Sequence, residues 1–142
     1  GQKIISHSYC ISKSAMGRKN MKIVALILNF PWSLLGSFYG LILLPMSIKI
    51  DKTELVIIVK VKRLWLNEIF LGRKVRGFTL GNMVLLSGMA ESNTYGHEIV
   101  HIEQFTKAPL LFPLFYLIES MKNGYWANKY EKEAYQRTNS SA

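Results

Sequence analysis

Cysteine, histidine and acidic residues are all scarce in this sequence. Its single cysteine, Cys10, cannot form a disulfide within the chain, so nothing suggests a secreted fold held together by internal disulfides. There is also no internal repeat and no low-complexity tract. The 142 residues, 49% of them hydrophobic, are sufficient to bury the core of one domain.

The shortage of acidic residues leaves the chain strongly basic, with nine Asp and Glu against 18 Lys and Arg and a formal net charge of +9. Such a charge favours an anionic partner. No recognition-helix, zinc-finger or base-stacking motif accompanies it, so nucleic acid is disfavoured. Five basic residues precede position 23 and eight lie within 49–76, on both sides of an uncharged stretch. This distribution fits a domain held against an anionic lipid surface, without fixing its orientation.

The uncharged stretch covers residues 23–46 and is long enough for a helix that crosses a bilayer. Asn29 and Pro31 interrupt it, and Pro31 is expected to kink the helix or to begin a second one. We favour a membrane-embedded helix. A helix in the core or a re-entrant one remains open, and a cleaved signal peptide is disfavoured because no small-x-small cleavage site follows. Residues 1–20 are expected to form a disordered tail, and 21–46 the hydrophobic segment.

The few histidines include one informative pair. Residues 97–101 read His-Glu-Ile-Val-His, which places His97 and His101 one turn apart on the same face of a helix. Two imidazoles so placed can share one tetrahedral metal, usually zinc. Glu98 beside them can take a proton from the water that such a metal activates. The motif therefore predicts metal-assisted hydrolysis, most often of a peptide bond; the alternative is a helix with two unrelated surface histidines.

The residues around the motif support a helix with one buried side. Thr94 is a plausible N-cap just before it, and Asn93 is a second choice. Ile99 and Ile102 fall on the face away from the histidines, so the metal-binding side is expected to face a cleft. Gln104 shares the histidine face. It could orient a ligand, contact the substrate or simply be a polar residue at the edge of the cleft.

A zinc site that keeps one position for water needs a third protein ligand. His7 lies in the unpatterned tail, so a downstream carboxylate is the better candidate. Glu131 and Glu133 diverge on a helix and cannot both face one metal; Glu131 is favoured, although Asn128 and Glu131 also read as a capping box. Tyr135 lies four residues beyond Glu131 on the same face, where its phenol could stabilise an oxyanion or simply pack.

The remaining pattern predicts an α+β fold. Residues 47–90 read as strands, mainly 54–62 and 78–87, with Gly81-Asn82 as a bulge or bend in the second. After a break at Ala108-Pro109, a short apolar helix is expected to pack on the core or lie at a membrane interface. A final helix follows. The expected order is a hydrophobic N-terminal helix, a small sheet, the motif helix and two further helices, with 47–142 as the metal-binding domain.

His97-Glu98-x-x-His101 followed by Glu131-x-Glu133-Ala134 resembles the zincin metallopeptidases whose third ligand is a glutamate, the gluzincin-like group. Members of the CAAX-prenyl-protease type carry an aspartate four residues after that glutamate, where this chain has Tyr135. The carboxylate that supports a metal-bound histidine in those members is therefore missing here. Over residues 22–136 the chain also resembles small, uncharacterised bacterial membrane-associated proteins with the same motif.

The resemblance implies a zincin-like domain that binds Zn2+ through His97, His101 and Glu131 and cleaves a peptide or protein substrate with Glu98. It implies that an edge strand within residues 82–87 binds the substrate in extended form. It also places the chain at a membrane, the bacterial inner membrane. The alternative is a non-catalytic metal-binding or membrane-scaffold protein that retains this fold. Nothing in the sequence indicates an oligomeric state.

Overall fold

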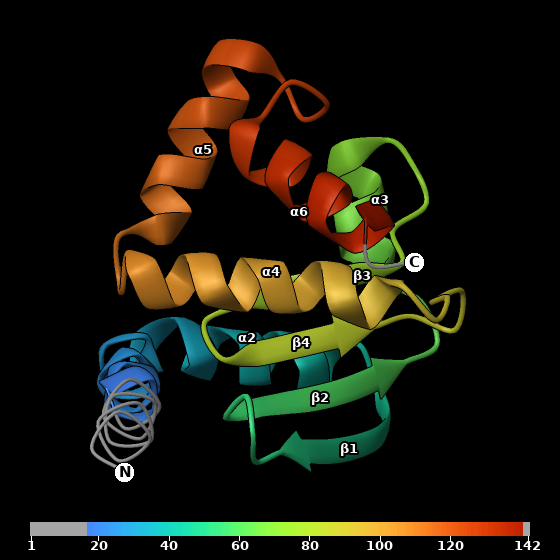
Figure 1. The fold of residues 1–142 in the computed structure, drawn as a ribbon. Coiled ribbons are helices and arrows are strands. Elements are labelled where there is room, and N and C mark those ends of the chain that lie inside the picture. The colour runs from blue at the N-terminus through green and yellow to red at the C-terminus, as the bar shows by residue number, and fades with distance from the viewer. Residues whose placement is uncertain (1–16, 141–142) are drawn as a thin grey trace, which may run out of the picture.

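The computed structural model describes residues 17–140 and has an α+β architecture, as the sequence predicts (Figure 1). The described part of the chain begins with a helix over Gly17–Leu28. The other elements, in chain order, are α2 (Phe30–Ile42), β1 (Pro45–Asp51), β2 (Val56–Val61), α3 (Trp65–Leu71), β3 (Gly77–Leu80), β4 (Met83–Leu86), α4 (Thr94–Lys107), α5 (Phe112–Asn123) and α6 (Lys129–Ser140).

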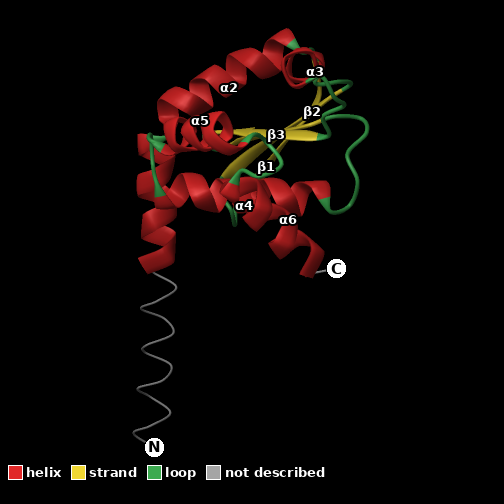
Figure 2. Ribbon diagram, turned by 90° about the horizontal axis from the view of Figure 1, so that it is seen from above, coloured by secondary structure: helices red, strands yellow, loops and turns green. Residues whose placement is uncertain are grey.

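The four strands form one mixed sheet in the order β1-β2-β4-β3. β1 pairs with β2 and β3 pairs with β4 in antiparallel fashion, while β2 and β4 are parallel. Figure 2 shows α2 on one side of the sheet and α4 with α6 on the other. One group of buried residues lies on the α2 side, including Val59 and Leu85. A second group joins Ile102 of α4 to Val84.

The region read as strands differs from the prediction in two places. Residues 78–87 form a hairpin of β3 and β4, because Gly81 adopts a φ of +60° and reverses the chain. Residues 65–71, also read as part of the strand region, form the short helix α3, which Gly72 ends in the left-handed conformation. Seven residues are too few to show a clear helical period, which explains this miss.

The uncharged stretch does not form one helix. The helix Gly17–Leu28 and α2 meet at Asn29 with a bend of 65°, and Pro31 lies in the first turn of α2. The stretch then ends within β1. No single described helix is both long and apolar enough to cross a membrane, although the bent pair together meets that test on length and composition. Residues 17–20, expected in the tail, are helical, whereas residues 1–16 lie outside the described part.

Asn29 ties this break to the far end of the motif helix. Its buried side chain donates from Nδ2 to the carbonyl oxygen of Phe105 at 3.3 Å and accepts from the backbone N–H of Leu110 at 2.8 Å. The β3–β4 turn closes against the same point, since a Cβ on Gly81 would lie 2.5 Å from the backbone nitrogen of Ser33. The end of α4, the start of α2 and the hairpin turn are thus held together.

Candidate metal centre

The helix α4 carries both histidines of the motif on the side that faces α6. Asn93 is its N-cap residue, without a side-chain capping bond, while the Thr94 hydroxyl accepts from the backbone N–H of Glu91. Ile102 is buried against the sheet and Ile99 packs partly buried beside it. The apolar residues of α4 therefore fix its rotation, and this turns the histidines away from the sheet.

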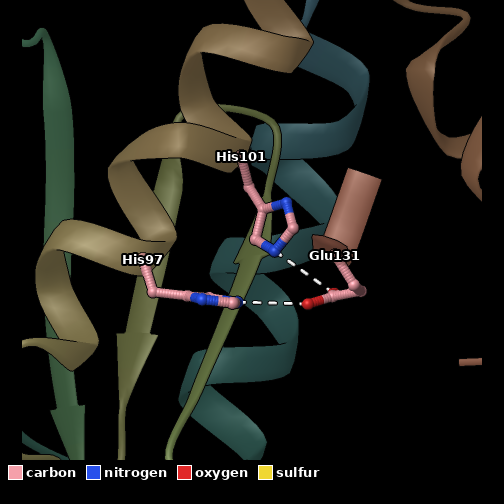
Figure 3. Close-up of side chains that lie close together, drawn as sticks. All are labelled: His97, His101 and Glu131. Atoms are coloured by element: carbon pink, nitrogen blue, oxygen red, sulfur yellow. Dashed lines mark hydrogen bonds and ion pairs between the residues drawn. The ribbon is translucent and has the colours of Figure 1, made fainter. Parts of the chain in front are cut away.

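The helix α6 supplies the third residue of the cluster. Asn128 is fully buried, and its side chain accepts from the backbone N–H of Tyr130 at 2.9 Å and donates to the Ser120 hydroxyl at 2.8 Å. This side chain caps the start of α6 and anchors it to α5. Glu131 does not complete a capping box: its carboxylate points at the two histidines of α4 (Figure 3).

The three side chains converge on one point. His97 Nε2 lies 3.1 Å from Glu131 Oε2, and His101 Nε2 lies 3.2 Å from Glu131 Oε1. One ligand atom from each of the three residues lies within 4.8 Å of the others. Two imidazole nitrogens and a carboxylate are a common donor set for zinc, whose bonds of about 2.0–2.1 Å at a tetrahedral centre put neighbouring donors about 3.3 Å apart. The cluster therefore fits a divalent metal ion.

Gln104 determines which nitrogen of His101 is available. Its Nε2 donates to the backbone carbonyl of Tyr130 and to Glu133 Oε2, both at 3.1 Å, so the amide orientation is fixed by two acceptors. Its Oε1 therefore faces His101 Nδ1 at 2.8 Å, and that nitrogen must donate. The Nε2 atom is left to face Glu131 and the cluster. Support of this kind fixes the tautomer of a metal-binding histidine.

Glu133, the second candidate for the third ligand, is not part of the cluster and is linked to it through Gln104. It accepts from Gln104 and lies 3.4 Å from Nη1 of Arg137. The other candidate, Glu131, is the one that the structure brings to the histidines. Glu133 thus orients Gln104 by a hydrogen bond, and Gln104 orients His101 by another.

Two tyrosines that the sequence analysis did not select hold the carboxylate of Glu131. Tyr116 of α5 donates to Oε1 at 2.7 Å, and Tyr125 of the α5–α6 turn donates to Oε2 at 3.1 Å. Burial and the charge of Glu131 both raise the pKa of each tyrosine, so both remain protonated donors. No local pattern marks them, because their roles depend on how α5 packs against α6.

His101 and Glu131 perturb each other strongly. Burial alone lowers the pKa of His101, but its hydrogen bond to Glu131 and the charges of Glu98 and Glu131 outweigh this effect and raise it to about 9. Burial opposes ionisation of Glu131, yet its hydrogen bonds to His101 and His97 hold the pKa of that carboxyl well below its usual range. Without a metal, the pair is therefore an ion pair at neutral pH.

Glu98 lies beside the cluster and turns towards β3. It is buried, it accepts from the Thr79 hydroxyl at 2.5 Å, and a Cβ on Gly77 would lie 2.8 Å from its Oε1. Burial is the main influence on the pKa of Glu98 and raises it, while the charge of His101 and the Thr79 hydrogen bond act in the opposite direction. A carboxyl with a raised pKa is suited to proton transfer near neutral pH.

Tyr135 covers the His97 side of the cluster. Its ring lies 4.5 Å from that of His97 and stacks on Trp126 at 6.1 Å. The Tyr135 hydroxyl lies 3.2 Å from that of Tyr125, and the guanidinium of Arg73 lies 3.9 Å from the Tyr125 ring centre. The structure thus places Tyr135 in an aromatic cluster with Tyr125 and Trp126, with its hydroxyl bonded to a neighbouring phenol.

The cluster is largely enclosed, a point on which the sequence makes no prediction. The side chains of His97, His101 and Glu131 are 13%, 8% and 6% exposed. One cavity of about 430 Å³ lies between α4 and α6, but its lining includes Gly96, Glu103 and Arg137 and none of the three cluster residues. Of the three side chains, that of His97 is the most exposed.

Comparison with known proteins gives no relative from which to transfer a role: no family model, no curated protein and no solved structure matches the chain significantly.

Proposed function

We propose that the chain is a zinc-dependent metallopeptidase of the zincin-like type. The observation that carries the proposal is that His97, His101 and Glu131 converge on one point. They come from two helices, and Glu131 follows His101 by 30 positions along the chain. The hydrogen bonds from Gln104, Tyr116 and Tyr125 behind them support it, because groups that orient metal ligands are typical of a built site.

When bound, zinc would lower the pKa of a coordinated water and polarise a carbonyl. The protein's part is to hold three donors and to leave one position open. His97 and His101 supply their Nε2 atoms, and Glu131 supplies an oxygen that its two tyrosines keep in place. A structural site would be closed by a fourth protein ligand, and among the described residues the group contains only these three.

Glu98 is the proposed proton carrier. It accepts the proton of the attacking water at its carboxylate and delivers it to the leaving nitrogen of the peptide. The raised pKa of this buried carboxyl favours the first step, because it makes the carboxylate a stronger base towards the attacking water. Thr79 holds the carboxylate through Oε2, which leaves Oε1 on the side of Gly77.

An extended peptide substrate would lie along β3. The expected strand within residues 82–87 is wrong for this role, because β4 is bonded to β2 and β3 on its two sides. β3 is the strand at the end of the sheet, and Gly77 brings its backbone next to Glu98. Pairing with this edge would carry a scissile bond past the carboxylate.

Metal analysis combined with one substitution tests the proposal. Purified protein should contain one zinc per chain, and a His97→Ala, His101→Ala double variant should contain none. Glu98→Gln should keep the zinc, because Glu98 is not in the ligand set, and lose at least about a hundredfold in peptide hydrolysis, since general acid–base catalysis contributes roughly that much or more.

Glu103→Gln on the same helix is the matched control and should retain both zinc and turnover. Glu103 lines the cavity between α4 and α6 and pairs with Arg137, away from the metal ligands. Full zinc content in the double variant would refute the metal site. Zinc that depends on the histidines, together with the same negligible turnover in wild type and Glu98→Gln, would instead assign the chain to the non-catalytic alternative.

A further inference from the structure

The helix α2 packs against the sheet through its smallest residues. Gly36 and Gly40 are its buried residues, and a Cβ on either would lie about as close as atoms can pack, 3.2 Å from Met83 and from Leu85. Tyr39 packs against the buried group on this side of the sheet, but most other large side chains of α2 are exposed. Those exposed are Phe30, Leu34, Leu35, Phe38, Leu41 and Ile42. This is the reverse of a helix that contributes its apolar side to a core.

The sheet continues this apolar surface beside α2. Ile48 and Ile50 of β1 are opposite Val59 and Ile57 of β2, and opposed residues point to the same side of a sheet. Val59 lies in contact range of Gly40, so that side is the one that α2 covers. Ile48, Ile50 and Ile57 are exposed. We name this surface, made by α2 and these three isoleucines, the apolar face.

The apolar face brings together nine exposed large apolar side chains, six from α2 and three from β1 and β2. Soluble monomers rarely expose continuous apolar patches of more than a few hundred Å². No charged residue occurs between Lys22 and Lys49 in the sequence, so the helix at its centre carries no charge that would favour water. A partner must therefore cover it, and the distribution of charge around it indicates which kind.

A cavity of about 370 Å³ at the start of the preceding helix gathers positive charge. Arg18, Lys19 and Lys22 line it from the helix Gly17–Leu28, and Lys52 lines it from the β1–β2 turn. Two acidic residues lie near. Glu54 pairs with Lys22 at 3.0 Å.

The other nearby carboxylate, Asp51, already accepts from the Tyr95 hydroxyl and from the backbone N–H groups of Thr53 and Glu54. Four cations against two engaged carboxylates leave a surplus of positive charge in the cavity. The cavity is thus suited to an anion such as a phosphate group.

The helix Gly17–Leu28 separates the cations Arg18 and Lys19 from the start of α2 by about the hydrocarbon thickness of one lipid leaflet. Figure 2 shows the helix Gly17–Leu28 running along one end of the molecule, from the α4 side towards α2. Lys19 and Leu28 are nine residues apart, or about 13–14 Å along a helix, close to the roughly 15 Å of hydrocarbon in half a bilayer. Between them Ile23, Val24 and Ile27 are exposed. With α2 in the hydrocarbon, the cations reach the level of the phosphates.

We propose that the apolar face and the basic cavity together dock the protein onto an anionic phospholipid membrane, the cavity binding a lipid phosphate. This inference is independent of the proposed hydrolytic function. A second copy of the chain would bury the apolar face but would bring like charges together at the cavity. A generic protein partner gives no reason for a cluster of cations one leaflet's thickness from α2.

Vesicle co-sedimentation of the full chain tests this. Wild type should bind vesicles that contain phosphatidylglycerol more tightly than vesicles of phosphatidylcholine alone. A Lys19→Glu, Lys52→Glu variant should lose roughly tenfold or more of its affinity for the anionic vesicles and change little on the neutral ones. A Phe38→Gln, Leu41→Gln variant should lose binding to both, because it removes exposed apolar area from α2.

The matched control reverses two exposed lysines elsewhere, Lys60→Glu with Lys132→Glu, and should keep most of the anionic binding. Circular dichroism confirms folding, and Leu41→Gln alone replaces the double α2 variant if that one does not fold. Equal losses in the control and cavity variants would overturn the phosphate site. Absence of vesicle binding, or a wild-type dimer that the α2 substitutions dissociate, would overturn the membrane as the partner.

Discussion

The hydrogen bond from His101 to Gln104 makes one nitrogen of the imidazole available at the cluster. Replacing Gln104 by Ala would remove the acceptor for Nδ1–H and free the ring to rotate or change tautomer. We expect zinc affinity to fall about 10- to 100-fold, the usual cost of losing such a partner. Competition with a chromophoric chelator measures the dissociation constant directly.

Gln136→Ala, an exposed glutamine of α6, is the control and should leave the affinity unchanged. If Gln104→Ala lowers the unfolding temperature of the metal-free protein but not its zinc affinity, Gln104 has a packing role only.

The raised pKa of His101 makes metal binding depend on pH. In the metal-free protein this imidazole is protonated below about pH 9, and a proton on Nε2 blocks the metal. Apparent zinc affinity should therefore rise about tenfold per pH unit up to that value and then level off, with close to one proton released from His101 for each zinc bound at pH 7.

Calorimetry in buffers of different ionisation enthalpy measures this proton release. A titration with no proton release at pH 7 would contradict the ion pair between His101 and Glu131.

At this scale the sequence predicts the residues that follow a local rule. The spacing of four identifies His97 and His101, and Glu131, the candidate favoured over Glu133, is the one that lies with them. Tyr116 and Thr79 escape prediction, because their hydroxyls reach Glu131 and Glu98 only after separate elements pack together. No periodicity in the sequence indicates these two hydrogen bonds.

Among the elements, the junction at Asn29 has the clearest energetic role. Its side chain satisfies the carbonyl of Phe105 and the N–H of Leu110 in a buried setting. Asn29→Ala should lower the free energy of unfolding by about 2–4 kcal/mol, because two backbone groups would lose their partner. Urea denaturation measures the change.

Asn20→Ala on the exposed part of the preceding helix is the control and should have an effect within about 0.5 kcal/mol. A similarly small effect at Asn29 would mean that water replaces its hydrogen bonds.

Long elements are the ones that the sequence predicts well. The motif helix and the final helix occur where their patterns place them. The helix α3 and the β3–β4 hairpin were missed, since each segment is too short for a period to appear. The uncharged stretch was misleading in another way, because hydropathy does not show that it ends in a strand.

For the whole molecule, a metal at the cluster would join α4 to α6. Zinc should stabilise the fold by about 2.7 kcal/mol when its free concentration is roughly 100 times the dissociation constant, because it binds only the folded state in which the three ligands meet. Thermal unfolding with increasing zinc should show a midpoint that rises, and a chelator should reverse the rise.

Magnesium is the matched control and should have little effect, since it prefers oxygen ligands over imidazole. The His97→Ala, His101→Ala variant should unfold at a midpoint independent of zinc. A zinc-dependent midpoint in that variant would place the metal elsewhere in the molecule.

The separation of the ligands along the chain also sets the order in which the centre is built during synthesis. The two imidazoles leave the ribosome first, and Glu131 follows 30 residues later. Until α6 is made and docks on α4, the nascent polypeptide offers a metal the two imidazoles but not the carboxylate of Glu131. Under the proposed function, an unfinished chain would not hydrolyse its neighbours, because the metal centre forms only with the completed tertiary structure.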